Sequence, residues 1–198
     1  MLMCRRCCRS SCCASIWWFI LTHIFGWTIV DPFPSNESGV FALLPHTSNW
    51  DFTLSPLLFV LNASFLVKSS LNFLLWFGFP VHPVKRSKSS QQTKMFVKQM
   101  KEHPGWLAMW VSGTRKYTNS ISSGFYYIAK EANVPISFVG VDWRTKRLFI
   151  SKTLDPSNMS KDEVLIKLQK FAKDKDLKNS GYRKENASTL KWKDKKIE

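Results

Sequence analysis

Apolar and polar positions follow two different periods along this chain of 198 residues. Short apolar runs flanked by Pro, Gly, Ser or Asn predict buried strands at residues 40–44, 65–67, 78–84, 107–111, 135–141 and 147–150. Between these runs, apolar residues with helical spacing predict helices at 50–62, 71–77, 89–103, 122–133 and 161–173. Because strands and helices alternate, we expect one α/β domain over residues 32–173, with a central mixed sheet flanked by helices.

The N-terminal region is apolar beyond a short basic segment. Residues 1–13 contain all five cysteines together with three arginines, and residues 14–30 contain no Asp, Glu, Lys or Arg. An apolar stretch of this length is at the lower limit for a bilayer span, and its tryptophans suit a membrane interface. We therefore expect an uncleaved membrane-anchor helix over residues 14–31, either spanning or re-entrant. The cysteines before it are candidates for S-acylation.

The C-terminal tail, residues 174–198, is rich in lysine and lacks apolar periodicity, so we expect it to be flexible. Before it, Ser160 and Glu163 have the spacing of a capping box at the start of the last helix. The tail closes with Lys195-Lys196-Ile197-Glu198, which resembles the dilysine signal of endoplasmic-reticulum membrane proteins with a cytosolic C-terminus. These features predict a protein of the endoplasmic-reticulum membrane.

A formal charge of +15 and a pI of about 9.8 indicate an acidic partner: nucleic acid, an anionic membrane or a phosphorylated substrate. Nine tryptophans and fifteen phenylalanines lie largely inside apolar runs, and no zinc-finger, RNP-like or basic heptad motif is present. A membrane or a lipid phosphate is therefore favoured, and a nucleic-acid-binding protein is an alternative that rests on charge alone. Residues 14–198 contain no cysteine, which excludes a disulfide framework and a cysteine nucleophile there, and we expect no metal site.

The first candidates for chemistry are His46 and Asp51, which follows it by five residues. Positions i and i+5 lie about 140° apart on a helix, so the pair meets only if the chain turns from a loop into a helix here. A carboxylate that holds an imidazole makes a minimal general-base unit. Spacing alone favours the alternative that His46 caps the next helix and Asp51 is a first-turn residue. His82 and His103 have no motif partner.

Four short stretches, in the same order, resemble the glycerolipid acyltransferase family, in particular its 1-acylglycerol-3-phosphate acyltransferases. The first, from His46 to Asp51, matches the H-x4-D motif of that family. The second runs from Gly78 to Arg86, the third is Ser112-Gly113-Thr114-Arg115, similar to E-G-T-R, and the fourth is Val134-Pro135-Ile136, similar to V-P-I. Because four blocks in order are more specific than one spacing, they reverse the preference for a helix cap at His46.

The resemblance implies a membrane-bound acyltransferase that moves a fatty acyl group from an acyl thioester such as acyl-CoA. Its acceptor would be a hydroxyl of a lysophospholipid or of glycerol phosphate, most simply lysophosphatidic acid, which becomes phosphatidic acid. The resemblance also implies His46 as the general base with Asp51 as its partner, and acyl-CoA as co-substrate with no further cofactor. The implied substrate-binding residues are Lys68, Gly78, Arg86, Ser112, Gly113, Thr114, Arg115 and Pro135.

The chain departs from the family at Ser112, which stands where the third block has glutamate. This departure supports an alternative, a non-catalytic lipid-binding relative of the family. We expect the bilayer, acyl-CoA and a phosphorylated glycerolipid as partners, and the sequence carries no signal for an oligomeric state.

Overall fold

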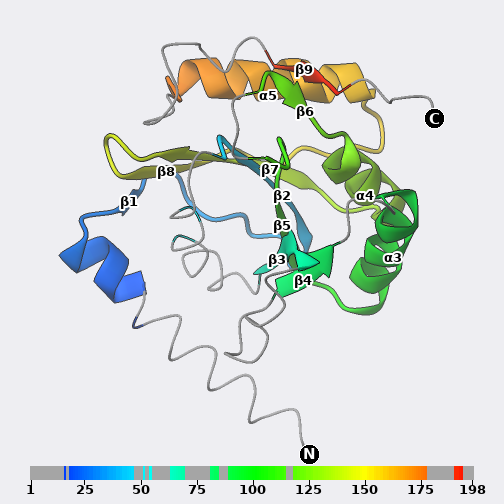
Figure 1. The fold of residues 1–198 in the computed structure, drawn as a ribbon, viewed down its shortest axis with the longest axis horizontal. Helices are drawn as coiled ribbons and strands as arrows, with labels where there is room; N and C mark the ends of the chain where they lie inside the picture. Colours follow the sequence, from blue (N-terminus) through cyan, green and yellow to red (C-terminus); the bar gives the residue numbers. More distant parts are fainter. Residues whose placement is uncertain are drawn as a thin grey trace, which may run out of the picture.

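A seven-stranded sheet forms the centre of the computed structural model (Figure 1). The structure describes residues 16, 18–46, 51, 54, 63–69, 81–84, 89–114, 118–177 and 190–193. The strands of this sheet are β1 (Thr28–Ile29), β2 (Gly39–Leu44), β3 (Ala63–Lys68), β4 (Val81–Val84), β5 (Trp106–Trp110), β7 (Ile136–Asp142) and β8 (Arg147–Ile150). A separate pair is formed by β6 (Ser120–Ile121) and β9 (Lys191–Trp192), and the helices are η1 (Ile20–Ile24), α3 (Ser89–Glu102), α4 (Gly124–Ala132) and α5 (Lys161–Asp174).

The strand order is β1-β8-β7-β2-β5-β3-β4, and the sheet is mixed, as predicted. Strands β7, β2, β5, β3 and β4 are parallel, whereas β8 pairs antiparallel with β7. Strand β2 lies between β7 and β5, with Leu43 opposite Trp110 and Leu44 opposite Gly140. The carboxyl ends of these three strands therefore meet at one edge of the sheet, where α/β proteins commonly bind ligands.

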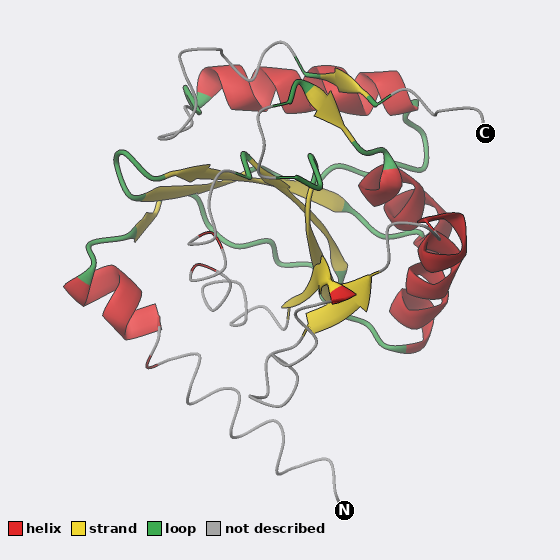
Figure 2. Ribbon diagram, viewed as in Figure 1, coloured by secondary structure: helices red, strands yellow, loops and turns green. Residues whose placement is uncertain are grey.

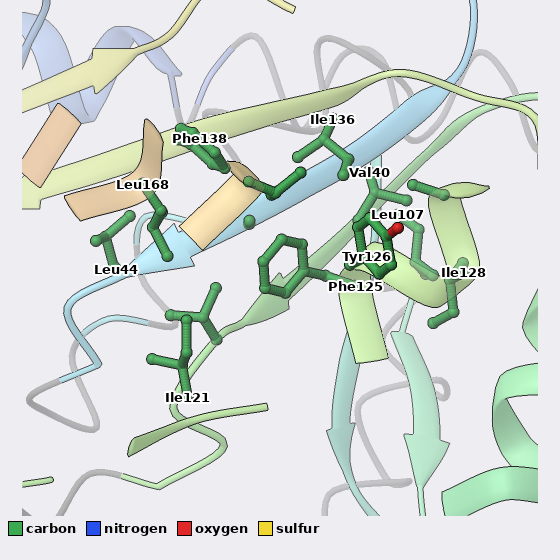
Figure 3. Close-up of a cluster of buried hydrophobic side chains, with 14 of the residues drawn as sticks. Val40, Leu44, Leu107, Ile121, Phe125, Tyr126, Ile128, Ile136, Phe138 and Leu168 are labelled. Atoms are coloured by element: carbon green, nitrogen blue, oxygen red, sulfur yellow. The ribbon is translucent and has the colours of Figure 1, made fainter. Parts of the chain in front are cut away.

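Both faces of the sheet are covered, which explains why β2 is apolar without alternation and buried at every residue. Helices α3, α4 and α5 cover one face of the sheet, which we call the helix-covered face (Figure 2). Val40, Ala42 and Leu44 belong to the core on this face. Figure 3 shows part of this core, in which Phe125 of α4 and Leu168 of α5 pack with the strand residues. The intervening residues of β2 point to the opposite face, whose core includes Phe41, Leu43, Trp106, Val139, Leu21 and Trp27.

The helices α3, α4 and α5 confirm the predictions at 89–103, 122–133 and 161–173. The capping box at the start of α5 is also present: Ser160 Oγ accepts a hydrogen bond from the backbone N–H of Glu163, whose carboxylate accepts from the backbone of Ser160. The helices predicted at 50–62 and 71–77 lie almost entirely outside the described residues. The six predicted strands correspond to β2, β3, β4, β5, β7 and β8.

The helix predicted over residues 14–31 ends earlier than expected. Helical structure stops at Ile24, and the chain then passes through Gly26, whose φ of +69° is a conformation that residues with a side chain rarely adopt. Trp27 is buried against the opposite face, and β1 pairs with β8 from Thr28 onward. Residues 28–29 therefore belong to the sheet, because this backbone turn directs them to its edge. No helix within the described ranges is both long and apolar enough to cross a membrane.

Two short stretches of the C-terminal region 174–198, for which we predicted a flexible tail, pack against the rest of the fold. Leu177 is buried against the helix-covered face, where it lies next to Gly140. Strand β9 pairs with β6, and Trp192 donates a hydrogen bond from Nε1 to Asp162 Oδ1 over 2.9 Å. The physical reason is that Leu177, Leu190 and Trp192 provide apolar contacts that a count of lysines does not reveal. Lys195 and Lys196 lie outside the described residues.

Candidate active site

His46 lies two residues beyond the carboxyl end of β2, and its side chain contacts Asp51. The distance from His46 Nδ1 to Asp51 Oδ2 is 2.8 Å, and the two side chains are 20% and 0% exposed. The predicted pairing of these residues is therefore present. If the buried carboxylate is ionised, Nδ1 carries the shared hydrogen and Nε2 keeps a lone pair that can accept a proton.

A tryptophan completes the described hydrogen bonds of the Asp51 carboxylate. Trp143 Nε1 donates to Asp51 Oδ1 over 2.7 Å, so each carboxylate oxygen faces a nitrogen at hydrogen-bond distance. This satisfies a requirement of burial, because an ionised carboxylate loses its water and must gain donors from the protein. Trp143 follows β7 directly, and the edge of the Trp27 ring packs against it with centroids 4.9 Å apart.

A second tryptophan lies against His46 from the other neighbouring strand. Trp110, the last residue of β5, stacks on the imidazole with ring centroids 4.6 Å apart and an angle of 16° between the planes. The His46–Asp51 pair is thus flanked by Trp110 from β5 and by Trp143 from beyond β7. Neither tryptophan was predicted as a site residue. The available signal was their position near the carboxyl ends of the strands predicted at 107–111 and 135–141.

The loop after β5 carries the third motif and begins beside the same strand end. The backbone N–H of Val111 donates to Leu43 O over 3.0 Å, which keeps this loop next to β2. Ser112 Oγ donates to Thr114 O over 2.8 Å, and Gly113 has a positive φ of +60°. Ser112 therefore stabilises the loop with a bond that an ionised glutamate cannot donate, and Gly113 provides a backbone conformation that favours glycine.

The remaining predicted substrate-binding residues fall into two groups. Lys68 is exposed at the carboxyl end of β3, which is parallel to β5, so it lies at the same edge of the sheet as the dyad. Gly78, Arg86 and Arg115 lie outside the described residues. Within the described ranges, no three His, Cys, Asp or Glu side chains are arranged to hold a metal ion.

Pro135 lies away from the dyad, and its role in substrate binding stays a prediction. It precedes β7, and its carbonyl accepts a hydrogen bond from Val40 near the amino end of β2. Strands rise by about 3.3 Å per residue, so the length of β7 places Pro135 roughly 20 Å from the edge where His46 lies. The V-P-I block also has a role in the fold, because Pro135 directly precedes a central strand and Ile136, its first residue, is fully buried.

Neither a protein-family model nor a curated protein sequence matches this chain. Among solved structures, it is similar to the crystal structure of the 1-acyl-sn-glycerophosphate (LPA) acyltransferase PlsC from Thermotoga maritima. The TM-score is 0.62 at 17% sequence identity, over 90% of this chain and 82% of that chain. The two proteins share a fold, as the four sequence blocks predict.

Proposed function

We propose that this protein is an acyltransferase that moves a fatty acyl group from an acyl thioester to a hydroxyl of a lysophospholipid or glycerol phosphate. The simplest reaction converts lysophosphatidic acid to phosphatidic acid. The observation that carries the proposal is the 2.8 Å contact between His46 and the buried Asp51 at the carboxyl edge of the sheet. The similarity of the fold to that of an LPA acyltransferase supports it.

In the proposed reaction, His46 Nε2 removes the proton of the acceptor hydroxyl while its oxygen attacks the thioester carbonyl. The tetrahedral intermediate then collapses, the carbon–sulfur bond breaks, and the imidazolium returns its proton to the thiolate that leaves. Asp51 stabilises the imidazolium between these two steps. The products are an ester and a free thiol, and His46 ends as it began, so no acyl-enzyme is required.

Basic residues would bind the phosphate of the acceptor. Lys68 supports this because it is exposed at the same edge of the sheet as the dyad. Arg86 and Arg115 are proposed from the sequence blocks, since a guanidinium can bind a phosphate through two parallel hydrogen bonds. Gly113 and Thr114 would allow the backbone to approach the acceptor closely.

Contact with a membrane is proposed for the helical segment that ends at Ile24. It exposes the large apolar side chains of Ile16, Phe19 and Ile24, and Phe25 directly after it is exposed as well. A short helix with an apolar surface suits the interface between headgroups and acyl chains. We expect the full chain to co-sediment with phosphatidic acid–phosphatidylcholine vesicles, and Phe19→Ser with Phe25→Ser to weaken this binding. Binding that the double variant retains in full would contradict the proposal.

Residence in the endoplasmic reticulum is proposed from Lys195 and Lys196.

The decisive experiment measures transfer of a labelled acyl group from acyl-CoA by the purified full chain, with a panel of lysolipid acceptors and glycerol 3-phosphate. General-base catalysis contributes typically about 10²–10⁴-fold, so we expect His46→Ala to reduce kcat by that factor. Equal turnover by wild type and His46→Ala would contradict the mechanism. If the wild type binds lysolipid but transfers no acyl group to any acceptor, the non-catalytic alternative raised by Ser112 replaces the proposal.

A further inference from the structure

Trp143 holds the oxygen of Asp51 that does not face His46. The indole nitrogen lies 2.7 Å from Oδ1, and His46 Nδ1 lies 2.8 Å from Oδ2. The carboxylate is buried, and its two described partners follow different strands. His46 follows β2, whereas Trp143, which is 92 residues from Asp51 in the sequence, follows β7. A hydrogen bond on each oxygen restricts rotation of the carboxylate, so Oδ2 stays directed at the imidazole.

Trp143 is itself held by contacts that do not involve Asp51. It begins the turn between β7 and β8, and the preceding Asp142 accepts hydrogen bonds from Arg144 N over 2.9 Å and from Thr145 Oγ1 over 2.6 Å. Trp27 packs edge-on against the indole, with an angle of 90° between the rings. The N–H group therefore points at Asp51 from a rigid support, which is the arrangement expected of a preorganised donor.

We propose that Trp143 is a positioning residue of the His46–Asp51 dyad, acting through Asp51 rather than on the substrate. This inference rests on the proposed acyltransferase function. The indole N–H orients the carboxylate. Its hydrogen bond also stabilises part of the negative charge of Asp51, which limits how strongly Asp51 stabilises the His46 imidazolium. Both effects follow from one hydrogen bond, which a phenyl ring in the same place cannot make.

Removing the donor has consequences that differ from those of a weakened core. Without the hydrogen bond from Trp143, the Asp51 carboxylate stabilises the His46 imidazolium more strongly. The protonated ring, which cannot act as a base, therefore persists to higher pH. Poorer orientation of Asp51 slows proton transfer and leaves the acceptor and thioester contacts intact. We therefore expect a lower kcat with little change in KM, together with a shift of the acidic limb of the pH profile.

The matched pair of variants is Trp143→Phe and Trp192→Phe. Trp192 also donates from Nε1 to an aspartate, Asp162 Oδ1 at 2.9 Å, but it packs on the helix-covered face, across the sheet from the dyad. Loss of a partner that orients a functional histidine typically costs about 10–100-fold in activity. We expect kcat to fall about tenfold or more in Trp143→Phe, with KM within about twofold and the acidic midpoint at higher pH. Trp192→Phe should match the wild type in all three.

A kcat and a pH profile in Trp143→Phe that match those of Trp192→Phe would overturn the role of Trp143. Wild-type protein that transfers no acyl group would instead overturn the proposed function, so the two failures are distinguishable. A measurement on the wild type and Asp51→Ala remains available if Trp143→Phe does not fold. In 15N-labelled protein, the indole N–H resonance of Trp143 should move upfield and exchange faster with water in Asp51→Ala. An unchanged resonance would contradict the bond on which the inference depends.

Discussion

Two histidines in this protein are half-buried, hydrogen-bonded to another side chain and packed on an aromatic ring, yet their surroundings differ in one decisive respect. His46 contacts a carboxylate, that of Asp51, and lies at the carboxyl edge of the sheet. His82 lies in β4, and its Nε2 is 3.0 Å from the amide nitrogen of Gln99 on α3. The amide nitrogen donates, so His82 Nε2 accepts and carries no hydrogen.

The partner decides what each ring can do with a proton. His46 can gain a proton on Nε2 while Nδ1 keeps its bond, and the carboxylate then stabilises the charge. His82 would have to give up its bond from Gln99 to be protonated, and burial lowers the pKa of His82 below its ordinary value. The comparison therefore supports the proposed role of His46 as a base and favours a structural role for His82.

The largest expected effect comes from giving His46 a neutral partner like that of His82. In Asp51→Asn, the amide keeps the size of the carboxylate but loses its charge and can favour the wrong tautomer of the ring. We expect kcat to fall by about 10²–10⁴-fold, with thermal unfolding close to that of the wild type. Labelled acyl transfer and circular dichroism measure the two quantities.

The control for this variant is Gln99→Leu, which removes the side-chain partner of His82. We expect it to leave kcat unchanged, because β4 and α3 lie away from the dyad. If Asp51→Asn retained wild-type kcat, the difference between the two histidines would have no catalytic meaning.

A smaller effect is expected from the aromatic rings. Trp110 lies face-on to His46, with centroids 4.6 Å apart, whereas Phe96 meets His82 edge-on at 5.8 Å. An aromatic face attracts a cation above it, so Trp110 would favour the imidazolium form that develops in the proposed reaction. Aromatic pairs contribute about 0.5–1.5 kcal/mol, so we expect Trp110→Leu to lower kcat by about 2–10-fold. Phe96→Leu should lower the unfolding temperature, since Phe96 is buried, and leave kcat intact.

This second comparison is measured by steady-state kinetics beside thermal melts of the same preparations. Equal losses of kcat in Trp110→Leu and Phe96→Leu would show that the stacked ring acts only through stability.

The fold could be predicted from the sequence because apolar runs mark the central strands. The pairing of His46 with Asp51 needed more, because their spacing alone favoured a helix cap and the other three blocks reversed that preference. Trp110 and Trp143 were not predicted: their positions near strand ends were visible in the sequence, but their contact with the dyad depends on β5 and β7 lying on either side of β2. Strand β1 was missed for a similar reason, since a two-residue edge strand is defined by its partner β8 and not by its own composition.

The smallest expected effect concerns stability and belongs to His82. Because burial lowers the pKa of His82 in the folded state, the unfolded chain binds more protons than the folded chain between that lowered pKa and the ordinary value of about 6.5. The free energy of unfolding therefore falls as the pH drops below about 6.5, by at most about 1.4 kcal/mol per pH unit for this one group.

Replacing the ring with a side chain that does not titrate isolates this contribution. In His82→Gln, we expect the free energy of unfolding to fall less between pH 7 and pH 5 than in the wild type, as measured by urea titration at each pH. His103→Gln is the matched control, because it makes the same substitution at an exposed histidine. If the free energy of unfolding of both variants changed with pH as it does in the wild type, His82 would not be held neutral by its burial. The contrast with His46, the ring that gains and loses a proton in the proposed reaction, would then rest on their partners alone.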